Sequence, residues 1–159
     1  MTTIKIATSD RTIADCFPII KYLRPHLQAE EFVERIRRQQ ESGYQLAFLA
    51  KDIRDVRDVR DVKEAIAPSS EPEIKAVGGF RISECLAFGK FLYVDDLVTQ
   101  EGDRSQGYGE ELLQWMISYA KTHNCEQFHL DSGVQRFAAH RFYFRQRLEI
   151  TSYHFALKL

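Results

Sequence analysis

Apolar and polar residues alternate in some segments of the chain, and apolar residues recur at helical spacing in others. Alternation and short apolar runs predict five strands, at Thr3–Thr8, Tyr44–Lys51, Ile74–Ser83, Phe91–Thr99 and Gln127–Asp131, and then one or two more within Ile150–Leu159. Helical spacing predicts four helices, at Thr12–Leu23, about Ala29–Glu41, from the turn at Gly107–Gly109 to Asn124, and about Arg136–Arg145. The order β-α-α-β-β-β-α-β-α-β indicates an α+β or α/β protein.

Two local features modify this pattern. Pro18 lies inside the first predicted helix and lacks the N–H that a helix needs, so a kink or a break is expected there. Gly78 and Gly79 lie side by side in the third predicted strand and mark a bend or a bulge.

A tandem repeat separates the second and third predicted strands. The tripeptide Arg-Asp-Val occurs three times between Arg54 and Val62, and a Pro- and Ser-rich stretch follows at 68–72. A helix would pair opposite charges four residues apart, whereas a solvated loop is the plainer reading. We expect an exposed insertion at about 52–73, partly helical at most, within a single domain that spans 1–159.

Composition excludes several classes of protein. The chain has 159 residues, 44% hydrophobic and 28% charged, with a formal net charge of −1, so no basic surface for nucleic acid is expected. No apolar run resembles a signal peptide or reaches transmembrane length. The three cysteines, Cys16, Cys85 and Cys125, are scattered, which argues against a disulfide framework or a zinc site and favours a cytoplasmic protein.

The stretch from Tyr93 to Trp115 joins a strand, a polar turn and a helix through two glycines. Such a turn presents backbone N–H groups at a helix N-terminus, which suits a phosphate. A mononucleotide P-loop would need a Lys after the glycines, and a dinucleotide fold would need a glycine where Leu112 stands. The plain alternative is a turn in which Gly107 and Gly109 only allow tight packing.

Two motifs resemble one known family. Arg104-Ser105-Gln106-Gly107-Tyr108-Gly109 resembles the Arg/Gln-x-x-Gly-x-Gly/Ala signature of the GCN5-related N-acetyltransferase (GNAT) superfamily, and a second block lies at 130–143 with the sequence Leu-Asp-Ser-Gly followed by Ala-His-Arg-Phe-Tyr. The resemblance is clear between Tyr93 and Leu148. The chain departs from the usual pattern at three positions, namely Ser105 (often Gly), Arg136 (often Asn) and Arg147 (usually Gly).

The resemblance implies a fold and a cosubstrate. The implied fold is an α/β fold of the α+β type, with a mixed, mostly antiparallel central sheet of six to seven strands and helices on both faces. The implied cosubstrate is acetyl-CoA, with no metal, no nucleic acid and no membrane involved, and a homodimer is compatible with it. By resemblance, the acetyl-CoA contacts fall on Leu97, Val98, Thr99, Arg104, Ser105, Gln106, Gly107, Tyr108, Gly109 and Glu110. Val98 would offer its amide to the thioester oxygen.

Three residues are the catalytic candidates. By resemblance, Tyr143 protonates the departing thiolate, although an aromatic of the triplet at 142–144 can also simply pack in a core. Asp95 or Asp96 would accept the proton of the amine. Strand alternation predicts that the two side chains face opposite sides of the sheet, so only one of them faces the acceptor. We rank Asp95 first. Glu84 and Asp131 are secondary candidates for attracting a cationic amine, and His140 for relaying a proton.

The predicted activity is therefore acetyl-CoA-dependent N-acetyl transfer to a primary amine of a small molecule or peptide by direct attack. The alternative is a non-catalytic module of the same fold that binds acyl-CoA as a regulatory ligand. Release of free thiol in the presence of amines distinguishes the two. By resemblance, the helix pair and the strand-end loops form the pocket that selects the acceptor. The resemblance is weakest in these parts, so the sequence does not identify the acceptor.

Overall fold

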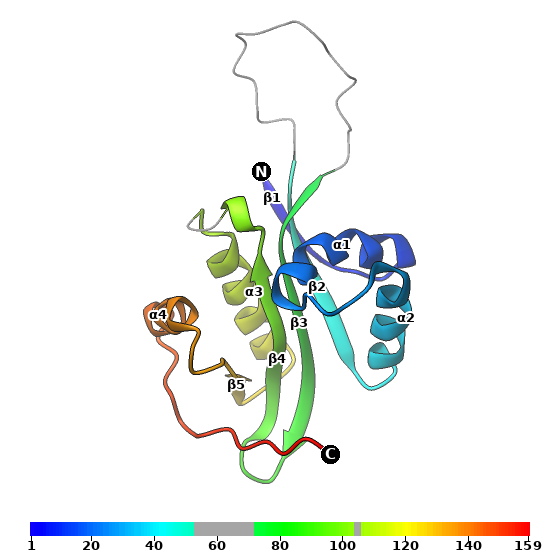
Figure 1. The fold of residues 1–159 in the computed structure, drawn as a ribbon. Coiled ribbons are helices and arrows are strands. Elements are labelled where there is room, and N and C mark those ends of the chain that lie inside the picture. Colours follow the sequence, from blue (N-terminus) through cyan, green and yellow to red (C-terminus); the bar gives the residue numbers. More distant parts are fainter. Residues whose placement is uncertain (53–71, 104–105) are drawn as a thin grey trace, which may run out of the picture.

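The computed structural model describes residues 1–52, 72–103 and 106–159 as one mixed sheet with helices on both faces (Figure 1). The strands are β1 (Thr2–Ile6), β2 (Tyr44–Lys51), β3 (Glu73–Cys85), β4 (Gly89–Thr99) and β5 (Gln127–Leu130). The helices are α1 (Asp10–Leu23), α2 (Ala29–Gln40), α3 (Tyr108–Thr122) and α4 (Phe137–Arg145), with a 3₁₀ turn, η2 (Glu101–Asp103), before α3.

The five strands lie in the order β1-β2-β3-β4-β5. The first four pair antiparallel with their neighbours, and β5 joins β4 in parallel. This arrangement confirms the α+β type and the mostly antiparallel, mixed sheet. The predicted count of six to seven strands is not confirmed, because the described residues form five.

Two apolar clusters cover the two faces of the sheet. One cluster joins α1 and α2 to the sheet and includes Ile13, Phe32 and Leu46, each no more than 1% exposed. The other joins α3 to the opposite face and includes Leu112 and Met116, which are fully buried. Each helix therefore buries one apolar stripe, and the sheet is apolar on both sides.

Helix α1 begins at a capping box and continues through its proline. The Ser9 hydroxyl accepts a hydrogen bond from the Thr12 N–H, and the Thr12 hydroxyl oxygen accepts one from the Ser9 N–H. Of the predicted kink or break at Pro18, the break is wrong, because the helix runs on to Leu23. Burial of Ile19 and Ile20 on the next turn offsets the hydrogen bond that the proline removes.

The segment Ile150–Leu159, called the C-terminal arm below, forms no strand. It leaves the end of α4 and passes β5 toward the lower end of the sheet in Figure 1. It pairs with no strand in the described part of the chain, although the outer edge of β5 has no strand partner there. The predicted last strands are therefore not found.

Strands β2 and β3, which flank the predicted insertion, pair antiparallel. Lys51 pairs with Glu73 at the end of this pairing, beyond a register shift between Leu49 and Ala50. The Arg-Asp-Val repeat itself lies outside the described residues. Within the described residues, no helix is both long and apolar enough to span a bilayer.

Candidate active site

Strands β4 and β5 separate partway along β4. Their parallel pairing runs from Phe91 with Gln127 to Val94 with Leu130 and then stops, while β4 continues to Thr99. From Leu97 to Thr99, β3 lies on one side of β4, and no strand in the described ranges lies on the other. This leaves an open main-chain edge on the half of β4 that the sequence assigned to acetyl-CoA.

A β-bulge lies where the strands separate. Gly79 of β3 pairs with Asp96 and the next residue, Phe80, pairs with Val94, so Asp95 is an extra residue on β4. The extra residue shifts the alternation of β4 by one position. Side chains at 92 and 94 face α3, and after the bulge those at 96 and 98 face α1 and α2.

The bulge corrects the prediction that the two acids face opposite sides of the sheet. Asp95 and Asp96 both line one cleft of about 430 Å³ beneath α1 and α2. Two polar tyrosines, Tyr44 and Tyr93, line the same cleft, and so does Arg24. Both carboxylates are thus available to one acceptor molecule.

Each acid has a fixed arginine partner. Arg24 donates from Nε to Asp96 Oδ1 at 2.9 Å and also donates to the Asp95 carbonyl at 3.0 Å. Arg81 donates from Nε to Asp95 Oδ2 at 3.0 Å. The Tyr44 hydroxyl donates to Asp96 Oδ2 at 2.9 Å. These contacts explain how two adjacent acids are tolerated in an apolar sheet.

The two acids differ in their surroundings. Burial raises the pKa of Asp95 above its ordinary value, and the hydrogen bond and charge of Arg81 oppose that rise. Tyr44 is buried beside Asp96, and burial followed by that negative charge raises the pKa of its phenol well above the usual value. Asp95 therefore lies where burial raises the pKa of its carboxyl, and the carboxylate of Asp96 is held by donors from Arg24 and Tyr44.

Helix α3 begins with an uncapped, glycine-led N-terminus. Gly107 is the N-cap with φ +87°, a conformation that favours glycine, and no side chain caps the helix. The first helical hydrogen bond is donated by the Glu111 N–H to the Gly107 carbonyl. Among the described residues, the N–H groups of 108–110 therefore have no hydrogen-bond acceptor. Such a set is a fitting cradle for a phosphate.

The two glycines of this turn have different roles. A β-carbon on Gly107 would meet nothing within 4 Å, whereas one on Gly109 would lie 3.1 Å from Cγ2 of Thr99. Gly109 thus allows the start of α3 to lie close to β4. Tyr108 is buried in the α3 cluster, so it can contribute only its backbone, and Gln106 and Glu110 are exposed. Arg104 and Ser105 lie outside the described residues.

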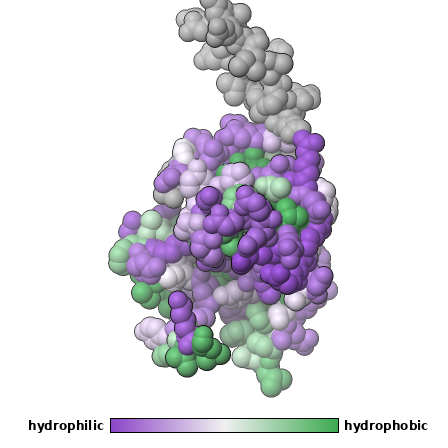
Figure 2. All heavy atoms as spheres, turned by 45° about the vertical axis from the view of Figure 1, so that its right-hand side comes forward, coloured by the Kyte–Doolittle hydropathy of each residue, from purple (hydrophilic) through white to green (hydrophobic). Residues whose placement is uncertain are grey.

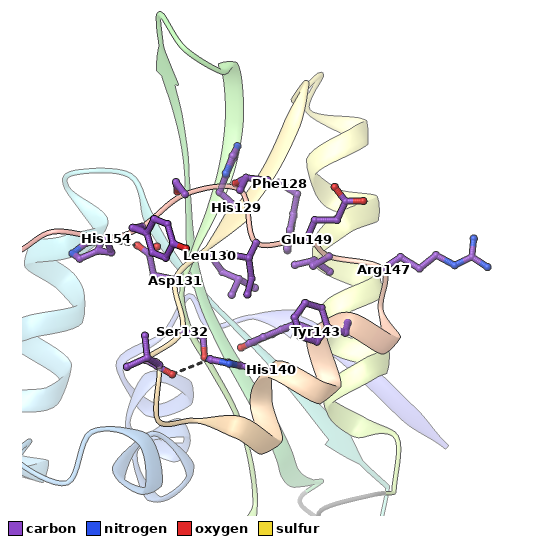
Figure 3. A pocket seen from close by; sticks show the side chains of 18 of the residues that line it. Phe128, His129, Leu130, Asp131, Ser132, His140, Tyr143, Arg147, Glu149 and His154 are labelled. Atoms are coloured by element: carbon purple, nitrogen blue, oxygen red, sulfur yellow. Dashed lines mark hydrogen bonds and ion pairs between the residues drawn. The ribbon is translucent and has the colours of Figure 1, made fainter.

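Tyr143 lies on α4 and faces a second, larger cavity. This cavity of about 840 Å³ lies between β5, α4 and the first half of the C-terminal arm, and Figure 3 shows Tyr143 and His140 projecting into it from α4. Burial raises the pKa of Tyr143, with Arg136 opposing the rise, so the phenol stays protonated at neutral pH. His140 Nε2 donates to the Gly133 carbonyl at 2.9 Å, which occupies that ring nitrogen.

The structure brings some of the predicted residues together and separates others. The acid pair lines one cleft, while Tyr143 lines the other cavity, and the two share no lining residue. Asp131 accepts a hydrogen bond from the Tyr93 hydroxyl at 2.5 Å and lines the cavity of Tyr143. Glu84 is exposed near the β3–β4 turn and lines neither cavity.

Sequence reasoning missed the partners of the acids. Arg24, Tyr44 and Arg81 come from α1's end, β2 and β3, and none is close to Asp95 or Asp96 in sequence. The alternation of the fourth strand carried no signal for the bulge, because apolar residues occupy both odd and even positions at 91–94 and at 97–98.

Comparison with known proteins gives one consistent family. Residues 24–148 match the model of the acetyltransferase (GNAT) family. An uncharacterized N-acetyltransferase, YhdJ of Bacillus subtilis (strain 168), is 30% identical over 144 residues, covering 90% of this chain and 88% of that protein.

Solved structures show the same fold at low sequence identity. A transcriptional regulator from Bacillus halodurans C-125 has a TM-score of 0.75 at 19% identity and covers 100% of both chains. A Trypanosoma brucei acetyltransferase has a TM-score of 0.72 at 14% identity, again over 100% of both chains. A glucosamine-6-phosphate N-acetyltransferase from Arabidopsis thaliana has a TM-score of 0.68 at 17% identity, covering 99% of this chain and 98% of that one.

Proposed function

Because this chain belongs to the acetyltransferase (GNAT) family, we propose that it moves an acetyl group from acetyl-CoA to a primary amine of a small molecule or peptide by direct attack. The observation that carries the proposal is the pair Asp95 and Asp96, which share one cleft beside the open edge of β4. A family fold alone does not define a reaction, whereas a paired acid site does supply proton-transfer chemistry.

The acid pair serves the amine. An alkylammonium has a pKa of roughly 10 and must lose a proton before its nitrogen can attack. Asp95 accepts that proton, directly or through water, because burial raises its pKa and so makes the carboxylate a better base. Asp96, held by Tyr44 and Arg24, lines the same cleft and would attract the cationic acceptor into it.

The main chain serves the cosubstrate. The N–H groups of 108–110, which have no acceptor among the described residues, would hold the pyrophosphate. The edge of Leu97–Thr99 that no described strand covers would pair with the extended pantetheine arm. The Val98 amide is the proposed donor to the thioester oxygen as that oxygen gains negative charge. Side-chain identity matters little for these contacts, which is consistent with the buried Tyr108 in the turn.

Tyr143 serves the leaving group. As the new C–N bond forms and the C–S bond breaks, the phenol donates its proton to the thiolate and later regains one from water. Its raised pKa keeps that proton available at neutral pH. Phe142, which packs against the α3 cluster, anchors the helical turn that carries Tyr143.

The decisive test measures thiol release from acetyl-CoA with a panel of primary amines. Release that depends on an amine supports the proposal, and Asp95→Asn should abolish most of it while CoA still binds. Tight CoA binding without release for any amine would instead support the regulatory module. Failure to bind CoA, measured by calorimetry, would contradict both.

A further inference from the structure

Lys75 on β3 is a charged residue inside the fold. It is 9% exposed, and no other charged residue in the ranges 1–52, 72–103 and 106–159 is buried. An ammonium group that leaves water is costly unless its N–H groups find acceptors. Lys75 Nζ lies 2.7 Å from Glu73 Oε1 and 2.7 Å from Asp103 Oδ2, and it donates to Gln100 Oε1 at 3.3 Å. Its three N–H groups therefore have three acceptors.

These contacts keep the side chain charged. Burial lowers the pKa of Lys75, but the hydrogen bonds and charges of Asp103 and Glu73 outweigh burial, so the pKa lies above its ordinary value. The side chain of Asp103 is 18% exposed, whereas that of Glu73 is 48% exposed. Because water weakens an ion pair, the pair with Asp103 is the better shielded of the two.

Two partners of Lys75 belong to the turn that leads from β4 to α3. Gln100 follows β4 and donates its N–H to the Lys75 carbonyl at 3.0 Å, and the Asp103 N–H donates to the Gln100 carbonyl at 3.1 Å. The Gln106 N–H in turn donates to the Asp103 carbonyl at 3.3 Å, directly before Gly107 caps α3. These contacts join a side chain of the sheet to the residue that precedes the N-cap.

Little apolar packing holds this turn. The 3₁₀ turn η2 has no buried residue, and a β-carbon added to Gly102 would meet no atom within 4 Å. Figure 1 places η2 and the start of β3 at the upper end of the sheet, and the face in Figure 2 is mainly hydrophilic at that end, below the grey atoms. Polar contacts, the pair of Lys75 and Asp103 above all, therefore hold the turn among the described residues.

We propose that Lys75 is a positioning residue for acetyl-CoA and acts through this turn: by holding Asp103, it sets where α3 begins. The N–H groups of 108–110 are then in place before the pyrophosphate arrives, so binding does not have to order them. Gly109, which lies close to Thr99, holds the same helix start from the side of β4. The inference rests on the proposed function, because it concerns the cradle of the pyrophosphate.

Lys75 also has an effect through charge alone. It neutralises two carboxylates close to the proposed site of an anionic ligand, and its loss would weaken CoA binding by repulsion even if the turn stayed in place. Asp103→Ala distinguishes the two effects. It removes a negative charge, which by charge alone would tighten CoA binding. It also removes the contact with Lys75, which by position would weaken CoA binding.

Calorimetric titration of CoA into the full chain measures the outcome. Lys75→Met and Asp103→Ala are each expected to raise the dissociation constant of CoA by about 10-fold or more, as for a lost hydrogen bond between charged groups. The double variant should bind about as weakly as either single variant, since all three lack the same contact. Lys75→Arg keeps the charge and should bind CoA more tightly than Lys75→Met. Glu101→Ala is the matched control, because it removes an exposed acid from the same turn and should not weaken binding.

S-acetylpantetheine, which lacks the pyrophosphate, separates positioning from damage to the fold. In Lys75→Met the KM for acetyl-CoA should rise by about 10-fold or more while kcat changes little, because the proposed catalytic residues are untouched. The kcat/KM for S-acetylpantetheine should stay near its wild-type value. An equal loss with both cosubstrates would mean that the substitution acts through the whole fold, and it would overturn the proposal.

The outcomes also distinguish this inference from the proposed function. If the wild type binds CoA and Lys75→Met binds it equally well, the inference alone is overturned. Tighter CoA binding by Asp103→Ala would overturn it too, because charge and not position would then explain Lys75. A wild type that binds no CoA would contradict the proposed function and this inference with it. Weaker CoA binding in both single variants, with S-acetylpantetheine unaffected, supports the inference.

Discussion

Tyr44 on β2 donates its hydroxyl hydrogen to Asp96 on β4, reaching past the intervening strand at a distance of 2.9 Å. The Tyr44 side chain passes over Gly79 of β3, the residue that pairs with Asp96. A β-carbon on Gly79 would collide with the Tyr44 hydroxyl. The side chain of Asp96 is only 15% exposed, so this donor replaces water that the carboxylate has lost. A glycine on β3 thus makes room for the bond that stabilises the acid.

Removing the Tyr44 hydroxyl should therefore destabilise the fold. Tyr44→Phe leaves Asp96 with Arg24 as its remaining side-chain donor, and we expect a loss of about 1.5–3 kcal/mol in the free energy of unfolding, measured by urea denaturation. Tyr22→Phe is the control, because Tyr22 is 50% exposed and should stay within about 0.5 kcal/mol of wild type. Equal stability of the two variants would contradict the role of the bond.

The pH dependence of activity should move when the partner of Asp95 is removed. Arg81 lowers the pKa of Asp95 against the effect of burial. In Arg81→Gln the carboxyl keeps its proton to a higher pH, and since a base must be ionised, the acidic limb of kcat/KM should shift to higher pH. Arg38→Gln removes the same charge from an exposed pair with Glu34 and should leave the limb in place. A shift in the opposite direction would exclude Asp95 as the base.

Tyr143→Phe should slow turnover and little else. The substitution keeps the ring and removes the proton donor, so kcat should fall by roughly 10²- to 10⁴-fold. The fall should be near the smaller of these values if the thiolate leaves readily without a proton. CoA affinity by calorimetry and the Tm should change little, since the aromatic burial is retained. A variant with wild-type turnover on a verified acceptor would remove Tyr143 from the mechanism.

Gly109→Val should weaken CoA binding through the position of α3. Because the nearest neighbour of an added β-carbon is Thr99 on β4, a valine pushes the start of α3 away from the strand and moves its N–H groups. We expect lower CoA affinity together with a lower Tm. Gly102→Val adds the same side chain where no atom lies within 4 Å, and it should leave CoA affinity nearly unchanged. Unchanged affinity in Gly109→Val would place the phosphate site elsewhere.

Arg147→Gly should make the protein more stable. Arg147 has φ +62°, a conformation that costs a residue with a β-carbon about 1 kcal/mol or more. Glycine, the usual residue of the family pattern here, adopts it freely, and a net gain of about 0.5–1 kcal/mol is expected in urea denaturation. Arg141→Gly, in the middle of α4, should instead lower the free energy of unfolding by about 1 kcal/mol.

Local patterns predicted the elements well because each element buries one apolar stripe. Strand β2 was predicted with the observed bounds, and α2 differs from its prediction by one residue. The break at Pro18 was wrong, since tertiary burial of the flanking turns outweighs one lost hydrogen bond. The C-terminal strands were wrong for a different reason. Their alternation is real, but alternation does not by itself make a segment pair, and this one pairs with no strand among the described residues.

The site was predictable in its residues and not in its geometry. Adjacent acids in an apolar strand indicate a function, and both Asp95 and Asp96 do line one cleft. Their shared face depends on the bulge in the register between β3 and β4, and simple alternation gives the wrong answer there. Likewise, nothing near Asp96 in sequence points to Tyr44, because that contact exists only once β2, β3 and β4 lie side by side.

The extra residue in β4 also determines which changes of chain length this protein can tolerate. Deletion of Asp95 would restore regular pairing with β3, because Val94 would still pair with Phe80 and Asp96 with Gly79. Leu97 would stay in the α3 cluster and Val98 in the cluster of α1 and α2. The sheet can therefore lose this one residue without exchanging its two cores, and what the deletion removes is the carboxylate that Arg81 holds. We therefore expect a variant that lacks Asp95 to fold and to lose the proposed base.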